Sequence, residues 1–294
     1  MEVARRPLHL SESPMPAKTA KPAKTAKPAS SGPMTRRVTL TALAAAVAAL
    51  VVVLVIALST AAGSPGSDVR LGGDAENVVA PALADVETPA AANAEGGIPV
   101  SKDGVGVAGA DDVVIEVFFD PMCRWCALFE QQFRPELDAA VESGGVTVVD
   151  RPVAFLDMQS GGTYSTRAVN ALAVVADEAP ELYPAMVETL LNHYPQGAED
   201  GLTDEEIAGL AADVGVPAEV VDRFTATTSV PYTTADGETG EAEARHFAAW
   251  VMAATAQANE DLGGLSTPTV LIDGQRFEGW QTPGALTEAI AAAR

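Results

Sequence analysis

The stretch VVIEVFFDPMCRWCALFE, residues 113–130, places a run of strand-forming residues just before two cysteines. Val113–Phe119 is almost continuously apolar, as is typical of a central strand that is buried on both faces. A helix is predicted from about Cys123 to Ser143, because large apolar residues recur in it at helical spacing. Pro135 lies inside this helix, so we expect a kink or a break there.

A second strand is predicted from Val146 to about Phe155, after the turn residues Gly144 and Gly145. Strand, helix and strand in this order form a unit with parallel strands. Near the C-terminus, Thr269–Ile272 reads as a strand, Asp273-Gly274 as a tight turn and Gln275–Phe277 as the returning strand. An amphipathic helix is predicted over Pro283–Ala293.

Between these two parts lies a long block that looks entirely helical. The Thr203–Glu206 stretch, TDEE, has the pattern of a capping box before an apolar run. Pro, Gly or polar residues separate the predicted helices. The predicted helices are Thr166–Ala179, Glu181–His193, Thr203–Val214, Pro217–Thr227 and Glu241–Glu260.

Cys123 and Cys126 are the only cysteines among the 294 residues. A structural disulfide over so short a loop would stabilise the fold little. A zinc site needs about four ligands, and the spacing of His193 and His246 fits no common zinc motif. Two inert buried thiols would not suit an exported protein, which meets oxidants. The short spacing favours a reversible dithiol–disulfide pair, because such a bond forms easily and costs little folding energy to break.

The position of Cys123 at a helix start favours a thiolate there, through backbone N–H groups and the helix dipole. Cys126 lies one turn further along and is predicted to be more buried, so Cys123 would attack and Cys126 would resolve. Arg124 would lower the pKa of the Cys123 thiol, unless it is simply a solvated residue, and the neighbouring Asp120 would oppose it. Trp125 is expected to be partly exposed.

At this point the chain resembles the DsbA-like thiol-disulfide oxidoreductases of the thioredoxin superfamily, in the membrane-tethered form of actinobacteria. The resemblance rests on VVIEVFFD, on CRWC at a helix start, on the helical block and on STPTVLIDG. It implies an α/β thioredoxin-like fold with an inserted helical domain at about 163–262. It also implies a cis-proline loop at Thr267-Pro268, which would bind the substrate strand.

The same resemblance implies an enzyme that exchanges disulfides with the thiols of exported proteins and needs no bound cofactor. A membrane redox partner, which the resemblance implies is quinone-linked, would reoxidise the pair. Arg124 and Trp125 replace the Pro and the His or Tyr that are common in the family, which leaves the direction of catalysis open. Glu116 could shuttle protons to Cys126 and tune the pair, or be a paired structural carboxylate.

Charge divides the chain in two. Residues 1–62 hold eight Lys or Arg and two acids, whereas residues 63–294 hold ten Lys or Arg and 38 acids. Such an acidic part argues against nucleic acid as a partner. Residues 36–62 are long and apolar enough to form a transmembrane helix, and the basic flank puts residues 1–35 in the cytoplasm as a disordered tail.

The remaining divisions are a flexible acidic tether rich in Ala, Pro and Gly, residues 63–107, and the folded domain, residues 108–294. We therefore expect a single-pass protein of the cell membrane with an extracytoplasmic catalytic domain. A cleaved signal peptide that starts at Met34 would export the same domain. A tethered reductase or isomerase, and a binding module without catalysis, remain the alternatives to a disulfide oxidase.

Overall fold

The fold is built around β3 (Val113–Phe119), which pairs in parallel with β4 (Val146–Pro152) and antiparallel with β7 (Thr269–Ile272). The computed structural model describes residues 70–71, 75–157, 162–194, 200–279 and 282–294. All of them belong to one unit, Ala57–Arg294. The main sheet has the strand order β2-β1-β4-β3-β7-β8. The predicted parallel unit and the central position of β3 are confirmed.

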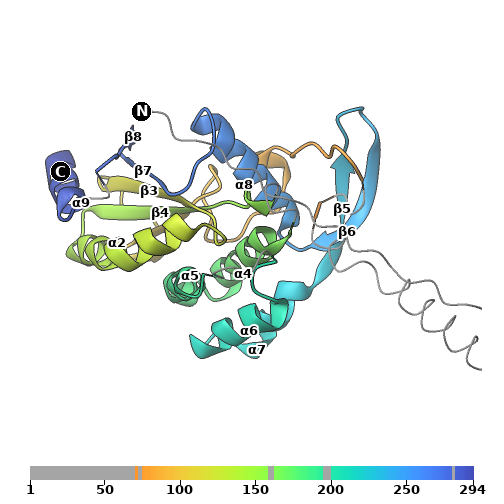
Figure 1. The fold of residues 1–294 in the computed structure, drawn as a ribbon, viewed down its shortest axis with the longest axis horizontal. Coiled ribbons are helices and arrows are strands. Elements are labelled where there is room, and N and C mark those ends of the chain that lie inside the picture. Colours follow the sequence, from red (N-terminus) through yellow and green to blue (C-terminus); the bar gives the residue numbers. More distant parts are fainter. Residues whose placement is uncertain (1–69, 72–74, 158–161, 195–199, 280–281) are drawn as a thin grey trace, which may run out of the picture. The chain divides into compact units, whose positions relative to one another are not determined.

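Alternate residues of β3 face different layers. Ile115, Val117 and Phe119 belong to the large core that includes α2 (Arg124–Ser143), whereas Phe118 packs with Ala258 of α8 (Ala248–Asp261). Figure 1 shows α2 and α8 lying on either side of the strands. A strand covered on both faces explains why the stretch is almost continuously apolar.

Helix α2 continues through Pro135 without a break. Pro135 and Gln131, whose carbonyl loses its usual helical donor, are both exposed, so water can satisfy that carbonyl. The predicted break is therefore absent. The helix starts after Cys123 and ends at Gly144, whose φ of 80° is readily adopted by glycine.

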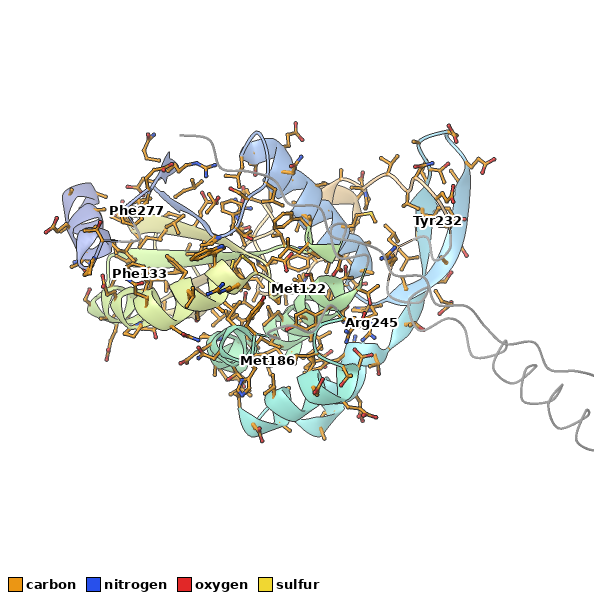
Figure 2. The ribbon with its side chains drawn as sticks, in the orientation of Figure 1. Met122, Phe133, Met186, Tyr232, Arg245 and Phe277 are labelled. Carbon is orange, nitrogen blue, oxygen red and sulfur yellow. The ribbon has the colours of Figure 1, made fainter. Side chains whose placement is uncertain are left out.

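In the block after β4, α5 (Tyr183–Asn192) packs against α2 and the other helices pack mainly against one another. α4 (Tyr164–Glu178) is buried along most of its length, and Met186 of α5 lies in the same core as Phe133 of α2 (Figure 2). Thr203 and Glu206 form the predicted capping box of α6. The remaining helices here are η2 (Pro180–Leu182), α6 (Asp204–Asp213), α7 (Ala218–Val221) and η3 (Asp222–Thr225).

The predicted helix over Glu241–Glu260 is wrong in its first part. Thr239–Arg245 is a strand, β6, which forms an antiparallel hairpin with β5 (Thr227–Thr233), and helix α8 begins only at Ala248. Ala and Glu favour a helix, but here the glutamates alternate with small residues, so the outward side chains accept hydrogen bonds across the hairpin. The insertion is thus not entirely helical.

Arg245 anchors the hairpin at its base. Its guanidinium donates to the Asp204 carboxylate of α6 at 2.7 Å and to the Phe224 carbonyl. Tyr232 lies further out on the hairpin (Figure 2). The hairpin is therefore fixed to the helices of the insertion by a buried cation.

The predicted tether at 63–107 is also corrected. β1 (Ile98–Ser101) pairs with the free edge of β4, and β2 (Gly104–Val105) pairs with β1. Val78 bridges to Thr234, and η1 (Leu83–Asp85) contacts α8. An unpaired edge of β4 would leave backbone groups without partners, and this segment satisfies them. The folded domain therefore begins well before residue 108.

The C-terminal hairpin matches the prediction closely. Asp273 and Gly274 have φ values of 46° and 74°, as a two-residue turn of this kind requires. They join β7 to β8 (Gln275–Arg276), and α9 (Ala285–Ala293) follows. The hairpin places the loop before β7 opposite the start of α2.

The predicted cytoplasmic tail, 1–35, and transmembrane helix, 36–62, lie outside the described residues. Within the part of the chain that the structure describes, no helix is both long and apolar enough to cross a membrane.

Candidate functional site

The two cysteines lie where β3 passes into α2. Cys123 is the N-cap residue of α2, and the N–H of Cys126 donates to the Cys123 carbonyl at 3.0 Å. Cys123 is 7% exposed and Cys126 is 1% exposed, and both are free thiols. Cys123 is thus the more exposed of the two cysteines.

Hydrogen bonds set the acidity of Cys123. The Cys126 side chain contributes most, and together with the Thr267 side chain and the backbone N–H groups of Cys126 and Trp125 it outweighs the effect of burial. These contacts lower the pKa of the Cys123 thiol to about 6. At neutral pH most of Cys123 is therefore a thiolate.

Cys126 has the opposite character. Burial, the hydrogen bond to Cys123 and the charge of the Cys123 thiolate all raise the pKa of the Cys126 thiol. Its sulfur also accepts a hydrogen bond from the backbone of Asp120, which opposes this effect. The pair therefore consists of one accessible thiolate and one protected thiol.

The loop before β7 closes the site from the other side. The peptide bond Thr267-Pro268 is cis, and the Cys123 thiol donates to the Thr267 carbonyl at 3.4 Å. The Thr267 hydroxyl is buried with no hydrogen-bond partner of normal geometry among the described residues, and its side chain acts to lower the pKa of both thiols. Residues 144 positions apart in sequence thus meet at one sulfur.

Arg124 and Trp125 both lie at the surface, next to the redox pair. The Arg124 guanidinium lies 5.6 Å from the centre of the Trp125 ring, and Trp125 is 53% exposed. The contacts that lower the pKa of Cys123 are hydrogen bonds, and Arg124 is not among the main ones. The tuning role of Arg124 stays a prediction.

Glu116 does not face the redox pair. Its carboxylate accepts from Arg151 of β4, with Nη2 at 2.6 Å, and the Arg151 guanidinium lies over the Phe118 ring. These side chains are on the α8 side of the sheet, whereas Cys126 packs on the α2 side with Val117. The structure therefore corrects the proposed proton shuttle and favours the paired structural carboxylate.

Asp120 is the buried acid near the cysteines. It is fully buried, and its carboxylate accepts from Met122 N at 2.8 Å, Leu156 N at 3.0 Å and Ser165 Oγ at 2.6 Å. Sequence reasoning placed Asp120 near Cys123 but missed these partners, because Ser165 comes 45 residues later. The signal in the sequence that could have pointed to a buried role for Asp120 was its position directly after a buried strand.

The predicted histidine candidates lie apart from the cysteines. His193 Nδ1 contacts the Thr189 carbonyl at 2.8 Å, and His246 Nε2 lies 3.3 Å from a carboxylate oxygen of Glu87. Among the described residues, no group of three or more His, Cys, Asp or Glu side chains is arranged to hold a metal ion.

Comparison with known proteins gives one family and several similar folds. The profile of the family described as Thioredoxin matches residues 105–292. MdbA, a thiol-disulfide oxidoreductase from Actinomyces oris, is 21% identical with a TM-score of 0.54, over 72% of this chain and 96% of that one. Reduced DsbA from Mycobacterium tuberculosis is 23% identical with a TM-score of 0.50, over 67% of this chain and 91% of that one. These likenesses show a shared fold.

Among curated proteins, the serine/threonine-protein kinase PknE of Mycobacterium tuberculosis is 36% identical over 122 residues. The match covers 40% of this chain and 22% of PknE, so the chain spans about a fifth of the length of that relative.

Proposed function

The chain belongs to the thioredoxin family, and on that premise we propose that it is a thiol-disulfide oxidoreductase whose redox pair is Cys123 and Cys126. The observation that carries this proposal is the opposite shift of two adjacent thiols. The pKa of Cys123 is lowered to about 6, while that of the more buried Cys126 is raised. An accessible thiolate beside a protected thiol is the arrangement that disulfide exchange requires.

The oxidised pair accepts two electrons from a substrate in two exchange steps. A substrate thiolate attacks the Cys123 sulfur, the Cys123–Cys126 bond breaks, and the Cys126 sulfur leaves and takes up a proton. A second substrate thiolate then attacks the substrate sulfur of the mixed disulfide. Cys123 leaves as a thiolate, the substrate gains its disulfide, and the protein is left reduced.

The proposed direction is oxidation of substrate thiols. Hydrogen bonds that stabilise the Cys123 thiolate stabilise the reduced protein, which makes the disulfide form a stronger oxidant. A low thiol pKa also makes Cys123 a good leaving group in the second step. A reductase or isomerase would use the same chemistry in the opposite direction.

Thr267 and Pro268 are proposed to bind the substrate next to Cys123. Their loop already contacts the Cys123 sulfur through the Thr267 carbonyl. An extended substrate segment can pair with such a loop through main-chain hydrogen bonds. This arrangement would hold a substrate sulfur close to Cys123.

The substrates are proposed to be thiols of exported proteins, and the domain to be held outside the cytoplasm by residues 36–62. The length and apolar character of that segment, and the arginines before it, support this topology. A membrane redox partner, of the quinone-linked kind expected from the family resemblance, would accept the electrons that the reduced pair carries.

The reduction potential of residues 63–294 tests the function. The protein is equilibrated in glutathione buffers and followed by tryptophan fluorescence, with Cys123→Ala as the control without the pair. A potential near about −120 mV supports an oxidase, and one near about −270 mV supports a reductase. Absence of any reversible transition would refute the catalytic function and favour a binding module.

A further inference from the structure

The exchange reaction described above makes no use of the Asp120 carboxylate, although the backbone of the same residue hydrogen-bonds both cysteines. Its three donors come from three separate segments: Met122 from the redox loop, Leu156 from the loop after β4, and Ser165 from α4. A buried carboxylate with three donors is fixed in position by all of them. It therefore joins the redox loop to the insertion.

The backbone of Asp120 holds both cysteines. Its carbonyl accepts from the Cys123 N–H at 2.8 Å, and its backbone donates to the Cys126 sulfur. Any shift of Asp120 therefore moves groups that hydrogen-bond the Cys123 backbone and the Cys126 sulfur. The side chain and the main chain of one residue thus connect the insertion to the redox pair.

The insertion side of this connection is equally fixed. Asp157 accepts from the N–H groups of Ser165 and Thr166, both at 2.8 Å, and so caps the first turn of α4. Ser165 therefore donates its backbone N–H to Asp157 and its hydroxyl to Asp120. The start of α4 has little freedom to move independently of the redox loop.

We propose that Asp120 is a positioning residue for the redox pair, through which the Ser165 hydroxyl of the insertion sets the reactivity of Cys123. The proposal rests on the proposed thiol-disulfide function and identifies a residue that tunes it. A structural role alone would make Asp120 contribute to stability without affecting the sulfur chemistry.

The titratable groups around Asp120 give the direction of the effect. Burial raises the pKa of the Asp120 carboxyl to about 7, the donors from Ser165, Leu156 and Met122 lower it, and the charge of Asp157 raises it. Tyr164 of α4 and the Cys126 thiol of α2 also lie near Asp120, and the charge of Arg70 acts on Asp157. Loss of the Ser165 hydroxyl should therefore raise the pKa of Asp120.

The test is the rate of Cys123 alkylation by iodoacetamide against pH, measured on the reduced full-length chain. Mass spectrometry identifies the alkylated cysteine. We compare the wild type with Ser165→Ala, Asp120→Asn and the double variant. Asp150→Asn is the matched control, because Asp150 is another fully buried carboxyl but faces Arg134 of α2.

The wild type should show a main inflection near pH 6 and a second one near pH 7, where Asp120 titrates. Ser165→Ala should move the second inflection up by about one pH unit, a tenfold change in that ionisation equilibrium. Asp120→Asn should remove it, and adding Ser165→Ala should then change nothing more, because the two residues act through one bond.

The proposal is overturned if Ser165→Ala leaves the alkylation profile unchanged. It is also overturned if Asp120→Asn lowers the melting temperature as Asp150→Asn does, with no change in the profile. Ser165→Ala removes a single oxygen atom, so it keeps the test decisive even where Asp120→Asn does not fold. Alkylation of Cys123 needs no protein substrate. If the chain showed no disulfide exchange, the proposed function would be refuted, and the alkylation profile would still test the role of Asp120.

Discussion

Asp120 and Asp150 are two buried acids that the fold holds in different ways. Both are fully buried, and burial raises the pKa of each carboxyl to about 7. Asp120 accepts three hydrogen bonds, whereas the Asp150 oxygens accept none from any described residue. The nearest cation to Asp150 is Arg134 of α2, with Nη2 at 3.8 Å, and Arg134 also binds Glu130 at 2.7 Å.

The difference follows from position along the strands. Asp150 lies within β4, where the surrounding backbone N–H groups are already used by the sheet. Asp120 lies beyond the end of β3, where loop N–H groups are available to a carboxylate. The Arg134 cluster, which consists of Arg134 and Glu130 on α2 and Asp150 on β4, is therefore held by charge. The redox end, which consists of Asp120 and the two cysteines, is held by hydrogen bonds from loop groups to Asp120. A change in the packing of those loops can therefore alter the reactivity of the cysteines.

The largest expected effect tests whether the Arg134 cluster is purely structural. Arg134→Met should lower the free energy of unfolding by about 3–5 kcal/mol, because Glu130 and Asp150 would lose the cation that compensates their burial. Urea denaturation measures this, with the exposed Arg124→Met as the control on the same helix. If Arg134→Met also shifted the pH midpoint of Cys123 alkylation, the two regions would be coupled and the Arg134 cluster would not be purely structural.

The next effect concerns the redox end. Cys126→Ala removes the contact that lowers the pKa of Cys123 most. The pKa should rise towards the ordinary thiol value of about 8.5, which reduces the thiolate fraction at pH 6 about a hundredfold. The pH dependence of iodoacetamide alkylation measures this. A midpoint that stays near pH 6 would mean that the backbone N–H groups and Thr267 are enough to keep the pKa of Cys123 low without Cys126.

The pH dependence of stability tests the raised pKa of Asp150. Because the folded pKa of Asp150 is about 7, above the unfolded value of about 3.9, its contribution is fully present below pH 4 and is lost as pH rises to 7. The free energy of unfolding of Asp150→Asn should therefore fall by about 4 kcal/mol less than that of the wild type between pH 4 and pH 8. Urea denaturation at several pH values measures both. Parallel curves would contradict the assignment.

The smallest expected effect separates hydrogen bonding from charge at the redox end. Arg124→Ala should move the alkylation midpoint of Cys123 by less than about 0.3 pH units, because an exposed cation acts through water. Lys102→Ala is a control for general charge. A rise of a full pH unit that high salt abolishes would restore the tuning role predicted for Arg124.

Local patterns were read correctly where neighbouring residues decide the structure. The strand before Cys123, the capping box at Thr203 and the turn at Asp273-Gly274 depend on residues a few positions apart. The side of the sheet that Glu116 faces was not decided in this way, because a strand buried on both faces has no polar side to orient it. Its partner, Arg151, lies 35 residues away.

The segments that were misread are those whose pairing strand was not recognised from the sequence. Ile98–Ser101 was assigned to a tether, but the free edge of β4, about 50 residues later, makes it a strand. Thr239–Arg245 looked helical, but pairing with the preceding strand β5 makes it one arm of a hairpin. In both, backbone hydrogen bonds to another strand outweigh the local preference, which amounts to at most about 1 kcal/mol per residue.

The amino-acid sequence by itself indicated the two cysteines proposed as the redox pair, their place at a helix start, and the cis-proline loop at Thr267-Pro268. Two cysteines three positions apart after a buried strand have few other chemical uses. Only the tertiary structure decided which acid lies beside them, because Asp120 meets Ser165 across 45 residues while Glu116 turns to the opposite layer. Spacing along a chain sets local geometry, whereas burial and long-range hydrogen bonds set the reactivity of a thiol.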